Sequence, residues 1–260
     1  MRFRGRTALV TGASSGIGRS CALLLAREDA QVLIAGRRAA ALEAVAQACA
    51  NARALPSDLA DPASLAEFCD GVLASVGSLD IVVHCAGVGI RAPADGTDPD
   101  EARRLVALNL LAPVEITRRL RPVMAPNSMI VMVSSVAGKV ALPGMAVYSA
   151  SKHALNAYAD ALRAELRGSG VSVLCACPGF VSTPFGRNML QGATSAPLPG
   201  SERLAISPDQ CAAAIVDAVC KGRRTVVVPR HGWMLVAFER ALPTAARAWM
   251  LRMARLGRTA

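Results

Sequence analysis

A glycine-rich turn near the N-terminus constrains the fold of this chain more than any other feature. Residues 7–11 (TALVT) form a short apolar run that is typical of a buried strand, and the turn Gly12–Gly18 (GASSGIG) follows it directly. Residues 19–27 then carry alanines and leucines on one helical face. In such a strand–turn–helix unit, backbone N–H groups and the helix N-terminus can receive a pyrophosphate. The pattern indicates an α/β fold that binds a nucleotide, although many loops use glycine for structural reasons alone.

The rest of the chain alternates between strand-like and helix-like segments. We expect strands near 6–11, 31–36, 52–56, 79–84, 128–134, 171–176 and 224–228, and helices near 16–29, 39–50, 62–75, 99–111, 113–124, 147–168 and 207–220. This order predicts a Rossmann-like, doubly wound parallel β-sheet of about seven strands with helices on both faces. Gly12, Ala86, Ser135 and Pro178 each follow a predicted strand. They should therefore meet at the carboxyl edge of the sheet, where such folds bind ligands.

Length and composition suit one domain of this kind. A chain of 260 residues with 53% apolar and only 3% aromatic side chains fits strands that are buried on both faces. We expect a catalytic domain at 1–230 and a basic helical extension of it at 231–260. The first strand begins within a few residues of Met1, and no run of 18 apolar residues occurs. Neither a signal peptide nor a transmembrane helix is therefore expected, which predicts a cytoplasmic protein.

The eight cysteines lack Cys-x-x-Cys spacing. Cys175 and Cys177 alternate in one predicted strand, so their side chains should point to the same side. We interpret the cysteines as small buried apolar side chains in a reducing compartment, in preference to a disulfide framework or a metal site. No metal is expected.

Tyr148 and Lys152 are four residues apart in a predicted helix, so they should lie on the same face. An ammonium beside a phenol favours the phenolate, and the expected result is a lowered tyrosine pKa. A tyrosine tuned in this way can exchange a proton with a substrate oxygen. The spacing alone is a weak signal, because solvated Tyr/Lys pairs are frequent on surface helices.

Taken together, these motifs resemble the short-chain dehydrogenase/reductase family in its typical single-domain form. They occur in the family's order: Thr11-Gly12-x-x-x-Gly16-x-Gly18, Asp58, Ala86-Gly87, Asn109, Ser134-Ser135, Tyr148-x-x-x-Lys152 and Pro178-Gly179-x-x-x-Thr183. Tyr148 follows Ser135 by 13 residues, which is the usual family separation. The resemblance covers about residues 5–230. It implies a hydride-transferring enzyme that forms a homodimer or homotetramer.

The resemblance also implies a catalytic set of Asn109, Ser135, Tyr148 and Lys152. In the reductive direction Tyr148 would protonate the carbonyl oxygen, and Ser135 would donate a hydrogen bond to the same oxygen. Lys152 would lower the tyrosine pKa and bind the nicotinamide ribose hydroxyls, and Asn109 would hold a water that links Lys152 to solvent. From the residues alone, Asn109 could equally be an exposed or locally capping asparagine.

The residue after the second strand decides which dinucleotide is bound. The family's acidic position, whose carboxylate holds the adenosine ribose 2′-hydroxyl, aligns with Gly36, and Arg37 and Arg38 follow. A guanidinium pairs well with a 2′-phosphate, so we expect NADP(H), bound mostly through Arg37. The alternative is a solvated arginine pair that opens a helix. The full set of implied cofactor contacts is Gly12, Ser14, Ser15, Gly16, Ile17, Gly18, Arg37, Arg38, Asp58, Leu59, Ala86, Gly87, Tyr148, Lys152, Pro178, Gly179, Val181 and Thr183.

Two positions weaken the match. Asp58 and Leu59 resemble the family's adenine-contacting pair, but Asp58 could instead cap the helix that begins near Pro62, where Asp61 is the better cap. The family's Asn-Asn-Ala-Gly motif reads His84-Cys85-Ala86-Gly87 in this chain, so the asparagine contact is lost at Cys85. We expect a local effect on stability and no loss of activity. His84 is interpreted as strand-end structure in preference to a catalytic base.

The substrate is the part that the sequence predicts least. Residues 184–207 should form a mobile substrate lid, because the segment is rich in glycine and proline and mostly apolar. Val140, Leu142 and Met145 border the catalytic tyrosine from the other side. These residues favour a small hydrophobic ketone, aldehyde or alcohol, of the acyl, steroid, retinoid or sphingoid-base type, over a sugar or a hydroxy acid.

The charge of the chain is concentrated at its C-terminus. Residues 221–260 contain nine Lys and Arg against one acid, Glu239, which gives +8 of the total +10. Within 244–258, Trp249, Met253 and Leu256 follow one helical face. A basic, tryptophan-bearing amphipathic helix is typical of contact with an anionic membrane surface, here the inner face of a membrane. The alternatives are a helix that covers the substrate cleft and one that joins subunits. No nucleic acid is expected, since aromatics are too few for base stacking.

Two functions remain open at this point. One is an NADP(H)-dependent carbonyl reductase or alcohol dehydrogenase that acts on a lipophilic substrate. The other is a catalytically idle NADP(H)-binding protein that senses redox state or serves as a partner subunit. The presence of Asn109, Ser135, Tyr148 and Lys152 favours the enzyme.

Overall fold

The structure is a computed structural model that describes residues 1–192, 204–246 and 248. Within them, seven strands form one parallel sheet in the order β3-β2-β1-β4-β5-β6-β7. Their bounds are β1 (Thr7–Thr11), β2 (Gln31–Gly36), β3 (Ala52–Pro56), β4 (Leu79–His84), β5 (Met124–Val133), β6 (Ser172–Pro178) and β7 (Thr225–Val228). The predicted Rossmann-like sheet of about seven strands is confirmed.

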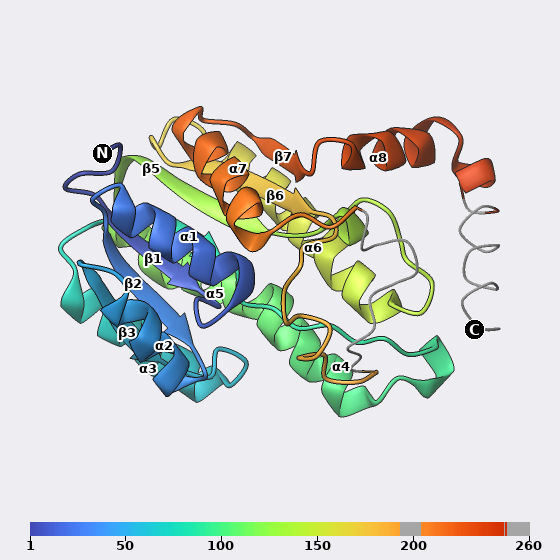
Figure 1. Ribbon diagram of the computed structural model, residues 1–260, viewed down its shortest axis with the longest axis horizontal. Coiled ribbons are helices and arrows are strands. Elements are labelled where there is room, and N and C mark those ends of the chain that lie inside the picture. The colour runs from blue at the N-terminus through green and yellow to red at the C-terminus, as the bar shows by residue number, and fades with distance from the viewer. Residues whose placement is uncertain (193–203, 247, 249–260) are drawn as a thin grey trace.

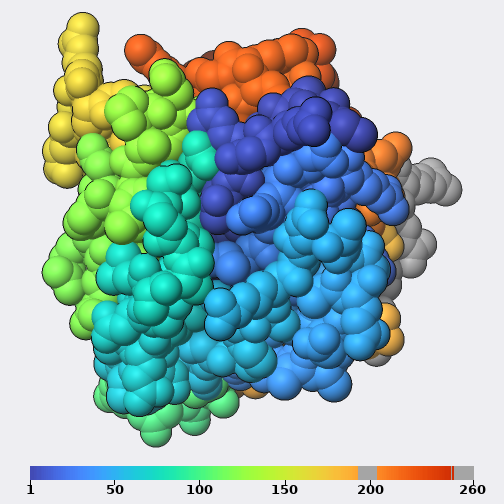
Figure 2. Space-filling model, turned by 90° about the vertical axis from the view of Figure 1, so that its left-hand side faces the viewer, coloured from blue at the N-terminus to red at the C-terminus, as the bar shows by residue number. Residues whose placement is uncertain are grey.

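Helices cover both faces of the sheet (Figure 1). One layer contains α1 (Gly16–Arg27), α2 (Ala39–Gln47) and α7 (Pro208–Cys220), and the other contains α3 (Pro62–Ser75), α4 (Pro99–Val106), α5 (Ala112–Leu120) and α6 (Ala146–Glu165). Viewed from the β3 end of the sheet, the surface is built mainly from the first half of the chain (Figure 2). A further helix, α8 (Gly232–Ala241), lies beyond β7 at the opposite end.

The two layers have separate cores because strand side chains alternate between the faces. Val82 packs on the side of α3 to α6, whereas its neighbours Ile81 and Val83 pack on the side of α1 and α7. All three are nearly fully buried. Strands that are buried on both faces have continuous apolar sequences, which is why their positions could be predicted closely.

The strand order reverses between β1 and β4, which are neighbours in the sheet but are separated by β2 and β3 along the chain. The crossovers from β1 and from β4 run to opposite sides, so a crevice opens beyond the carboxyl ends of these two strands. The turn Gly12–Gly18 follows β1, and Cys85-Ala86-Gly87 follows β4. Both predicted cofactor turns therefore face this crevice.

The predicted helix at 99–111 is in fact two segments. α4 ends at Val106, and residues Ala107–Leu111 form a turn of π-helix before α5 begins at Ala112. Pro113 lacks the N–H that a continuous α-helix would need, and the wide turn places Asn109 toward the interior, where it is fully buried. The sequence pattern predicted helix here but not the change in its winding.

Capping explains two helix starts. The Asp61 carboxylate accepts a hydrogen bond from the Ser64 backbone N–H at 2.8 Å, so Asp61 is the cap of α3, as predicted. Ser207 and Gln210 form a reciprocal capping box at the start of α7. Short 3-10 turns complete the structure at Ala94–Gly96, Arg121–Val123 and Val136–Gly138. Among the described residues, no helix is long and apolar enough to cross a membrane.

Candidate active site

The turns after β1 and β4 pack directly against each other. Gly12 adopts a positive φ of 69°, and a Cβ at this position would lie 2.7 Å from the Cα and the N of Ala86. The Thr11 hydroxyl accepts hydrogen bonds from the backbone N–H groups of Cys85 and Ala86, each at 3.1 Å. Backbone therefore meets backbone at the predicted pyrophosphate site, and no side chain fits between the two turns.

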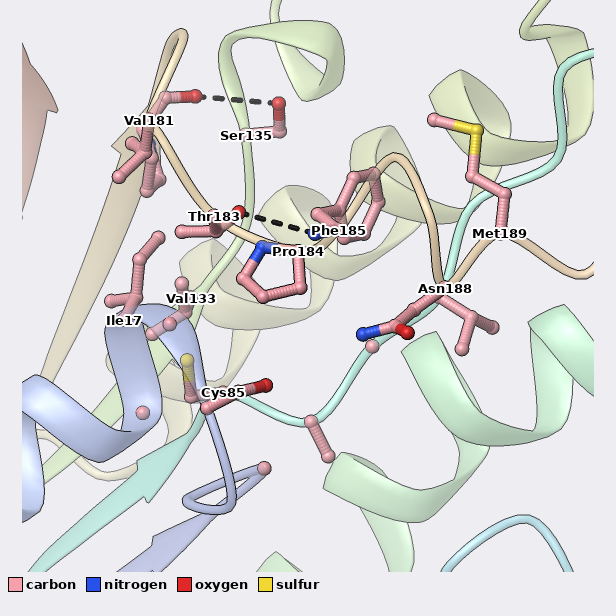
Figure 3. A pocket seen from close by; sticks show the side chains of 18 of the residues that line it. Ile17, Cys85, Val133, Ser135, Val181, Thr183, Pro184, Phe185, Asn188 and Met189 are labelled. Carbon is pink, nitrogen blue, oxygen red and sulfur yellow. Dashed lines mark hydrogen bonds between the residues drawn. The ribbon is translucent and has the colours of Figure 1, made fainter. Parts of the chain in front are cut away.

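These turns form one side of a cavity of about 1050 Å³. Figure 3 shows Ile17 and Cys85 on this side, with the segment from Thr183 to Met189 crossing the other. The predicted cofactor residues that line the cavity are Gly12, Ser14, Ser15, Gly16, Ile17, Gly18, Arg37, Arg38, Leu59, Ala86, Gly87, Tyr148, Lys152, Pro178, Gly179, Val181 and Thr183. Residues from five separate strand ends thus converge on one cavity, as the sequence predicted.

Asp58 is the predicted cofactor residue that does not line the cavity. Its carboxylate accepts from the Arg104 guanidinium at 2.5 Å and from the Ala60 backbone N–H at 3.1 Å. Burial alone would raise the pKa of this carboxyl, but those two hydrogen bonds and the charges of Arg104 and Arg37 together lower the pKa overall. Asp58 therefore neither caps α3 nor faces the cavity in this structure. Its neighbour Leu59 does line it.

The two arginines after β2 take different positions. Arg38 donates from Nη2 to the hydroxyls of Ser14 and Ser15, at 3.0 and 2.8 Å. Arg38 thereby joins the end of β2 to the glycine turn, a contact that its sequence position did not predict. Arg37 is exposed and lines the same end of the cavity beside Gly36, where no carboxylate is present. This end can hold a phosphate between a backbone turn and a guanidinium.

Ser135 is placed by a close contact between the turn that follows β5 and helix α6. A Cβ at Gly138 would lie 2.6 Å from the Lys152 carbonyl oxygen, so the turn sits directly on the helix backbone. The Ser134 hydroxyl donates to the same Lys152 carbonyl at 3.1 Å. The Ser135 hydroxyl accepts from the Ala137 backbone N–H at 3.0 Å and donates to the Pro178 carbonyl at 3.3 Å. These contacts hold Ser135 beside the face of α6 that carries Tyr148.

Lys152 and Asn109 meet under the turn after β4. Lys152 is 5% exposed, and its ammonium donates to the Val133 carbonyl at 3.0 Å. Asn109 accepts from the Val88 backbone N–H and donates to the Val88 carbonyl, both at 2.9 Å, and also donates to Ser151. A Cβ at Gly87 would lie 3.1 Å from the Asn109 Oδ1 and 3.5 Å from the Lys152 Nζ. The interpretation of Asn109 as an exposed or capping residue is therefore wrong.

The Tyr148 phenol does not titrate as the sequence predicted. Burial raises its pKa to about 12, although a hydrogen bond with the Ser135 hydroxyl opposes the shift. Burial also lowers the pKa of Lys152 to about 8. The expectation of a lowered tyrosine pKa is thus wrong for this structure, because the Lys152 ammonium is directed at the Val133 carbonyl and the phenol is covered. At neutral pH this phenol carries its proton.

Phe185 of the lid is what covers the phenol. The rings of Tyr148 and Phe185 have their centroids 5.6 Å apart and are tilted by 56°. Phe185 in turn rests on Gly89, where a Cβ would lie 3.0 Å from its Cζ and 3.3 Å from the Met189 Cγ. In Figure 3 the Phe185 ring lies between the Thr183–Pro184 turn and Met189. The residues of the predicted lid at 193–203 lie outside the described part of the chain.

Several cavity residues were not found from the sequence. Val88, Arg91 and Leu108 line the cavity on the side of the lid residues 184–190, which we call the substrate end. Ser57 donates its backbone N–H to the Gly36 carbonyl and lines the side of Gly36 and Arg37, which we call the cofactor end. Arg91 belongs to the substrate end because its backbone N–H donates to the Gln191 carbonyl at 3.0 Å, which ties the segment after β4 to the lid. These two segments are about 100 residues apart, so no local pattern signals the contact. Leu142 and Met145 line the cavity as expected, whereas Val140 is buried and does not line it.

The structure confirms the expectation for His84 and, at six of the eight positions, the expected burial of the cysteines. His84 is buried, its Nε2 is 3.1 Å from the Thr117 hydroxyl, and burial lowers its pKa to about 3, so it acts as strand-end structure. The eight cysteines are free thiols. Cys175 and Cys177 point to the same side of β6 with their sulfurs 3.8 Å apart. Among the described residues, no cluster of His, Cys, Asp and Glu could hold a metal ion.

Known proteins are similar to this chain in sequence and in architecture. Residues 6–193 match the short chain dehydrogenase family. A dehydrogenase/reductase SDR family protein 7-like protein of Drosophila melanogaster is 33% identical over 259 residues, which cover 95% of this chain and 79% of the relative.

Solved structures agree with the sequence match. A metagenomic short-chain oxidoreductase in complex with NADP is 31% identical with a TM-score of 0.74, covering 88% of this chain and 98% of its own. A 3-ketoacyl-(acyl-carrier-protein) reductase from Brucella melitensis complexed with NADH is 26% identical with a TM-score of 0.77, covering 87% of this chain and 97% of its own. The glycine turn, which leaves no room for a side chain, fits a nicotinamide dinucleotide of the kind that both structures hold. The chain therefore belongs to the short-chain dehydrogenase/reductase family of oxidoreductases.

Proposed function

We propose that the protein is an NADP(H)-dependent oxidoreductase that interconverts a ketone or an aldehyde and the corresponding alcohol on a lipophilic substrate. One observation carries the proposal: Ser135 and Tyr148 line the same cavity beside Lys152, and the Ser135 hydroxyl is near enough to the phenol to act on its pKa. Two hydroxyl groups that converge on one point can bind a single carbonyl oxygen. The bound nicotinamide would supply or accept the hydride at the neighbouring carbon.

Each side chain then has a task that its position supports. Tyr148 would donate its proton to the carbonyl oxygen during reduction, and a phenol with a raised pKa is fully protonated for this step at neutral pH. Ser135 would donate a hydrogen bond to the same oxygen. Lys152 would bind the nicotinamide ribose hydroxyls and return a proton to Tyr148, for which a pKa of about 8 is well matched. Asn109 would fix the position of Lys152 from below through its contacts at Gly87 and Val88.

The choice of NADP(H) rests on the absence of a carboxylate at Gly36 and on the guanidinium groups of Arg37 and Arg38 at the same end of the cavity. An acidic side chain there would hold a 2′-hydroxyl and repel a 2′-phosphate. Arg38 already donates to Ser14 and Ser15, so Arg37 is the guanidinium that remains to pair with the phosphate. The relatives named above hold NADP in one structure and NADH in another, so they support either cofactor.

A lipophilic substrate is supported by the side chains around the catalytic phenol. The substrate end is lined mainly by apolar groups, namely Val88, Leu108, Leu142, Met145, Phe185, Met189 and Leu190. A polyhydroxylated substrate would leave its hydroxyls without partners against these side chains, at a cost of about 1–3 kcal/mol for each buried group. Within the described part of the chain, Arg91 and Arg187 are the charged residues that line this end. An apolar ketone would therefore bind with its carbonyl toward Tyr148 and any anionic group toward those arginines.

The test is a panel of aliphatic, steroid and acyl-thioester ketones with the matching alcohols. Turnover is measured from the change in absorbance of NADPH or of NADH. We expect turnover with apolar ketones, with kcat/KM for NADPH at least about tenfold above that for NADH, since one charged pair contributes about 1.5–3 kcal/mol. Equal use of the two cofactors would contradict the NADP(H) assignment. Tight NADPH binding without turnover of any member would instead favour the idle cofactor-binding protein.

A further inference from the structure

Large apolar side chains are exposed mainly in one region of the molecule. Among the described residues, the large hydrophobic side chains with high exposure are Met1, Leu111, Phe180, Leu204, Trp233, Met234 and Leu242. The last five belong to the segments around the carboxyl end of β6 and to α8. Single exposed apolar residues are normal, but a gathered set marks an interaction surface. We call these five residues the apolar rim.

The members of the apolar rim come together through specific contacts. Gly179 and Gly232 both pack on the Val136 side chain, with ideal Cβ positions 3.8 and 3.5 Å from its Cγ2. Phe180 and Trp233, the residues that follow these glycines, therefore project from neighbouring backbone. The Ile206 backbone N–H donates to the Phe180 carbonyl at 3.1 Å, which brings Leu204 to the same region. The backbone segments that carry Phe180, Trp233 and Leu204 thus lie close together near the carboxyl end of β6.

Helix α8 carries an apolar stripe on its outer side. Its inner side buries Val236, 1% exposed, while Trp233 and Met234 are 41% and 74% exposed. Ala237 lies three residues after Met234, and Ala241 lies four residues after Ala237, so both continue the outer stripe. Both are exposed. Arg240 shares this side, seven residues after Trp233, and is also exposed. A helix that faces outward with Trp, Met, Ala and Arg has the composition of an interfacial helix.

The apolar rim borders the entrance of the substrate cavity. Phe180 belongs to the rim and also lines the cavity. Ala205, the residue after the rim residue Leu204, lines the cavity as well. α8 begins at Gly232, in contact with Val136 of the turn that also carries Ser135. The described structure therefore places exposed apolar side chains next to the cavity that contains Tyr148.

Charge identifies what the apolar rim is suited to bind. Residues 221–260 have a net charge of +8, and Glu239 is their one acid. Arg230 directly precedes α8 and Arg240 lies on its outer side, both exposed. Interfaces between protein subunits deplete charge at their centre, whereas a basic apolar surface with a tryptophan matches anionic lipid headgroups above acyl chains. We propose that the apolar rim is a membrane-binding surface that docks the cavity mouth on an anionic lipid bilayer.

The experiment uses the full-length protein with a single tryptophan. Trp233 and Trp249 are the two tryptophans of the chain, so Trp249→Phe leaves Trp233 as the reporter. Vesicles of phosphatidylcholine, with or without phosphatidylglycerol, are added at low and at high salt. We expect co-sedimentation with the mixed vesicles only, a blue shift of Trp233 emission, and quenching of Trp233 by lipids brominated in the acyl chain. High salt should weaken the binding.

Substitutions separate the apolar and the charged contributions. Met234→Glu should weaken vesicle binding about tenfold or more, because a methionine side chain that becomes buried in the bilayer contributes about 1.5–3 kcal/mol. Arg240→Gln should weaken it about fivefold, the value of one basic residue near an anionic surface. The control is Leu111→Glu, which changes a leucine that is 55% exposed and lies outside the rim, and it should leave vesicle binding unchanged.

Three results would each overturn the proposal. The first is the absence of sedimentation with phosphatidylglycerol vesicles at low salt. The second is binding without quenching of Trp233, which would mean that the basic C-terminal residues attach the protein while α8 stays in water. The third is a vesicle-independent dimer in light scattering that Met234→Glu dissociates, which would assign the rim to a second copy of the chain. None of these readouts depends on catalysis, so a failed substrate assignment would not affect them.

Discussion

The two ends of the cavity are built by different means. The cofactor end is made where backbone touches backbone: Gly12 leaves no room for a Cβ against Ala86, and the Thr11 hydroxyl binds two consecutive N–H groups. The substrate end is made where side chains rest on one another, as Phe185 does on Tyr148 and Gly89. A backbone contact tolerates almost no substitution, whereas a side-chain contact can change in size. We infer that the cofactor end determines whether the protein is active at all. The substrate end determines which substrates it accepts.

The substitution with the largest expected effect is Gly12→Ala, which tests the backbone contact at the cofactor end. A methyl group 2.7 Å from the Ala86 backbone must separate the two turns, and the positive φ adds strain. We expect the free energy of unfolding to fall by about 3 kcal/mol or more and NADPH affinity to be lost. Gly222→Ala is the matched control, since Gly222 has a φ of 58° and open space around it. It should lose only about 1–2 kcal/mol. Urea denaturation and calorimetric titration measure both, and equal losses would refute the backbone-contact argument.

Tyr148→Phe tests the point at which the two ends meet. The substitution keeps the ring contact with Phe185 and removes only the proton donor. We expect kcat to fall about 10²–10⁴-fold with NADPH affinity nearly unchanged. Tyr158→Phe is the control on the same helix, because Tyr158 is the other tyrosine of the chain and does not line the cavity. Turnover of Tyr148→Phe within about tenfold of the parent would remove Tyr148 from its proposed role.

The arginines after β2 should separate into two effects at the cofactor end. Arg37→Asp places a carboxylate where it repels a 2′-phosphate and can hold a 2′-hydroxyl. It should reduce kcat/KM for NADPH about 10- to 100-fold and leave NADH use equal or improved. Arg38→Ala removes the hydrogen bonds to Ser14 and Ser15, so it should weaken both cofactors by a smaller and similar factor. A loss of NADPH preference in Arg38→Ala alone would exchange the two assignments.

The contrast between the ends also explains what the sequence could predict. All seven strands and the turn Gly12–Gly18 follow from local patterns, because apolar runs and glycine spacing determine backbone contacts directly. The burial of Asn109 does not, since it depends on a π-helical turn and on hydrogen bonds between the Asn109 side chain and the Val88 backbone. The pairing of Asp58 with Arg104 and the raised pKa of Tyr148 depend on side chains from distant segments. Local sequence carries no signal for such contacts.

The smallest expected effect belongs to Phe185→Ala, and it tests the substrate end directly. Removing the ring should admit water to the phenol, so the pKa of Tyr148 should move from about 12 toward its ordinary value of 10. Reduction needs the protonated phenol, and its rate is lost as pH rises through that pKa. The alkaline fall in kcat/KM should therefore begin at lower pH in the variant, while bulkier ketones gain activity a few-fold.

Met189→Ala is the control for the change in cavity size. Met189 lines the cavity and also packs on Gly89, but the ring contact with Tyr148 is made by Phe185. Its truncation should widen the substrate range without moving the pH profile. If the two variants shift the profile equally, or neither does, the raised pKa of Tyr148 has a source other than the lid. The phenol would then be insulated by the fixed part of the site, and the lid would act on substrate shape alone.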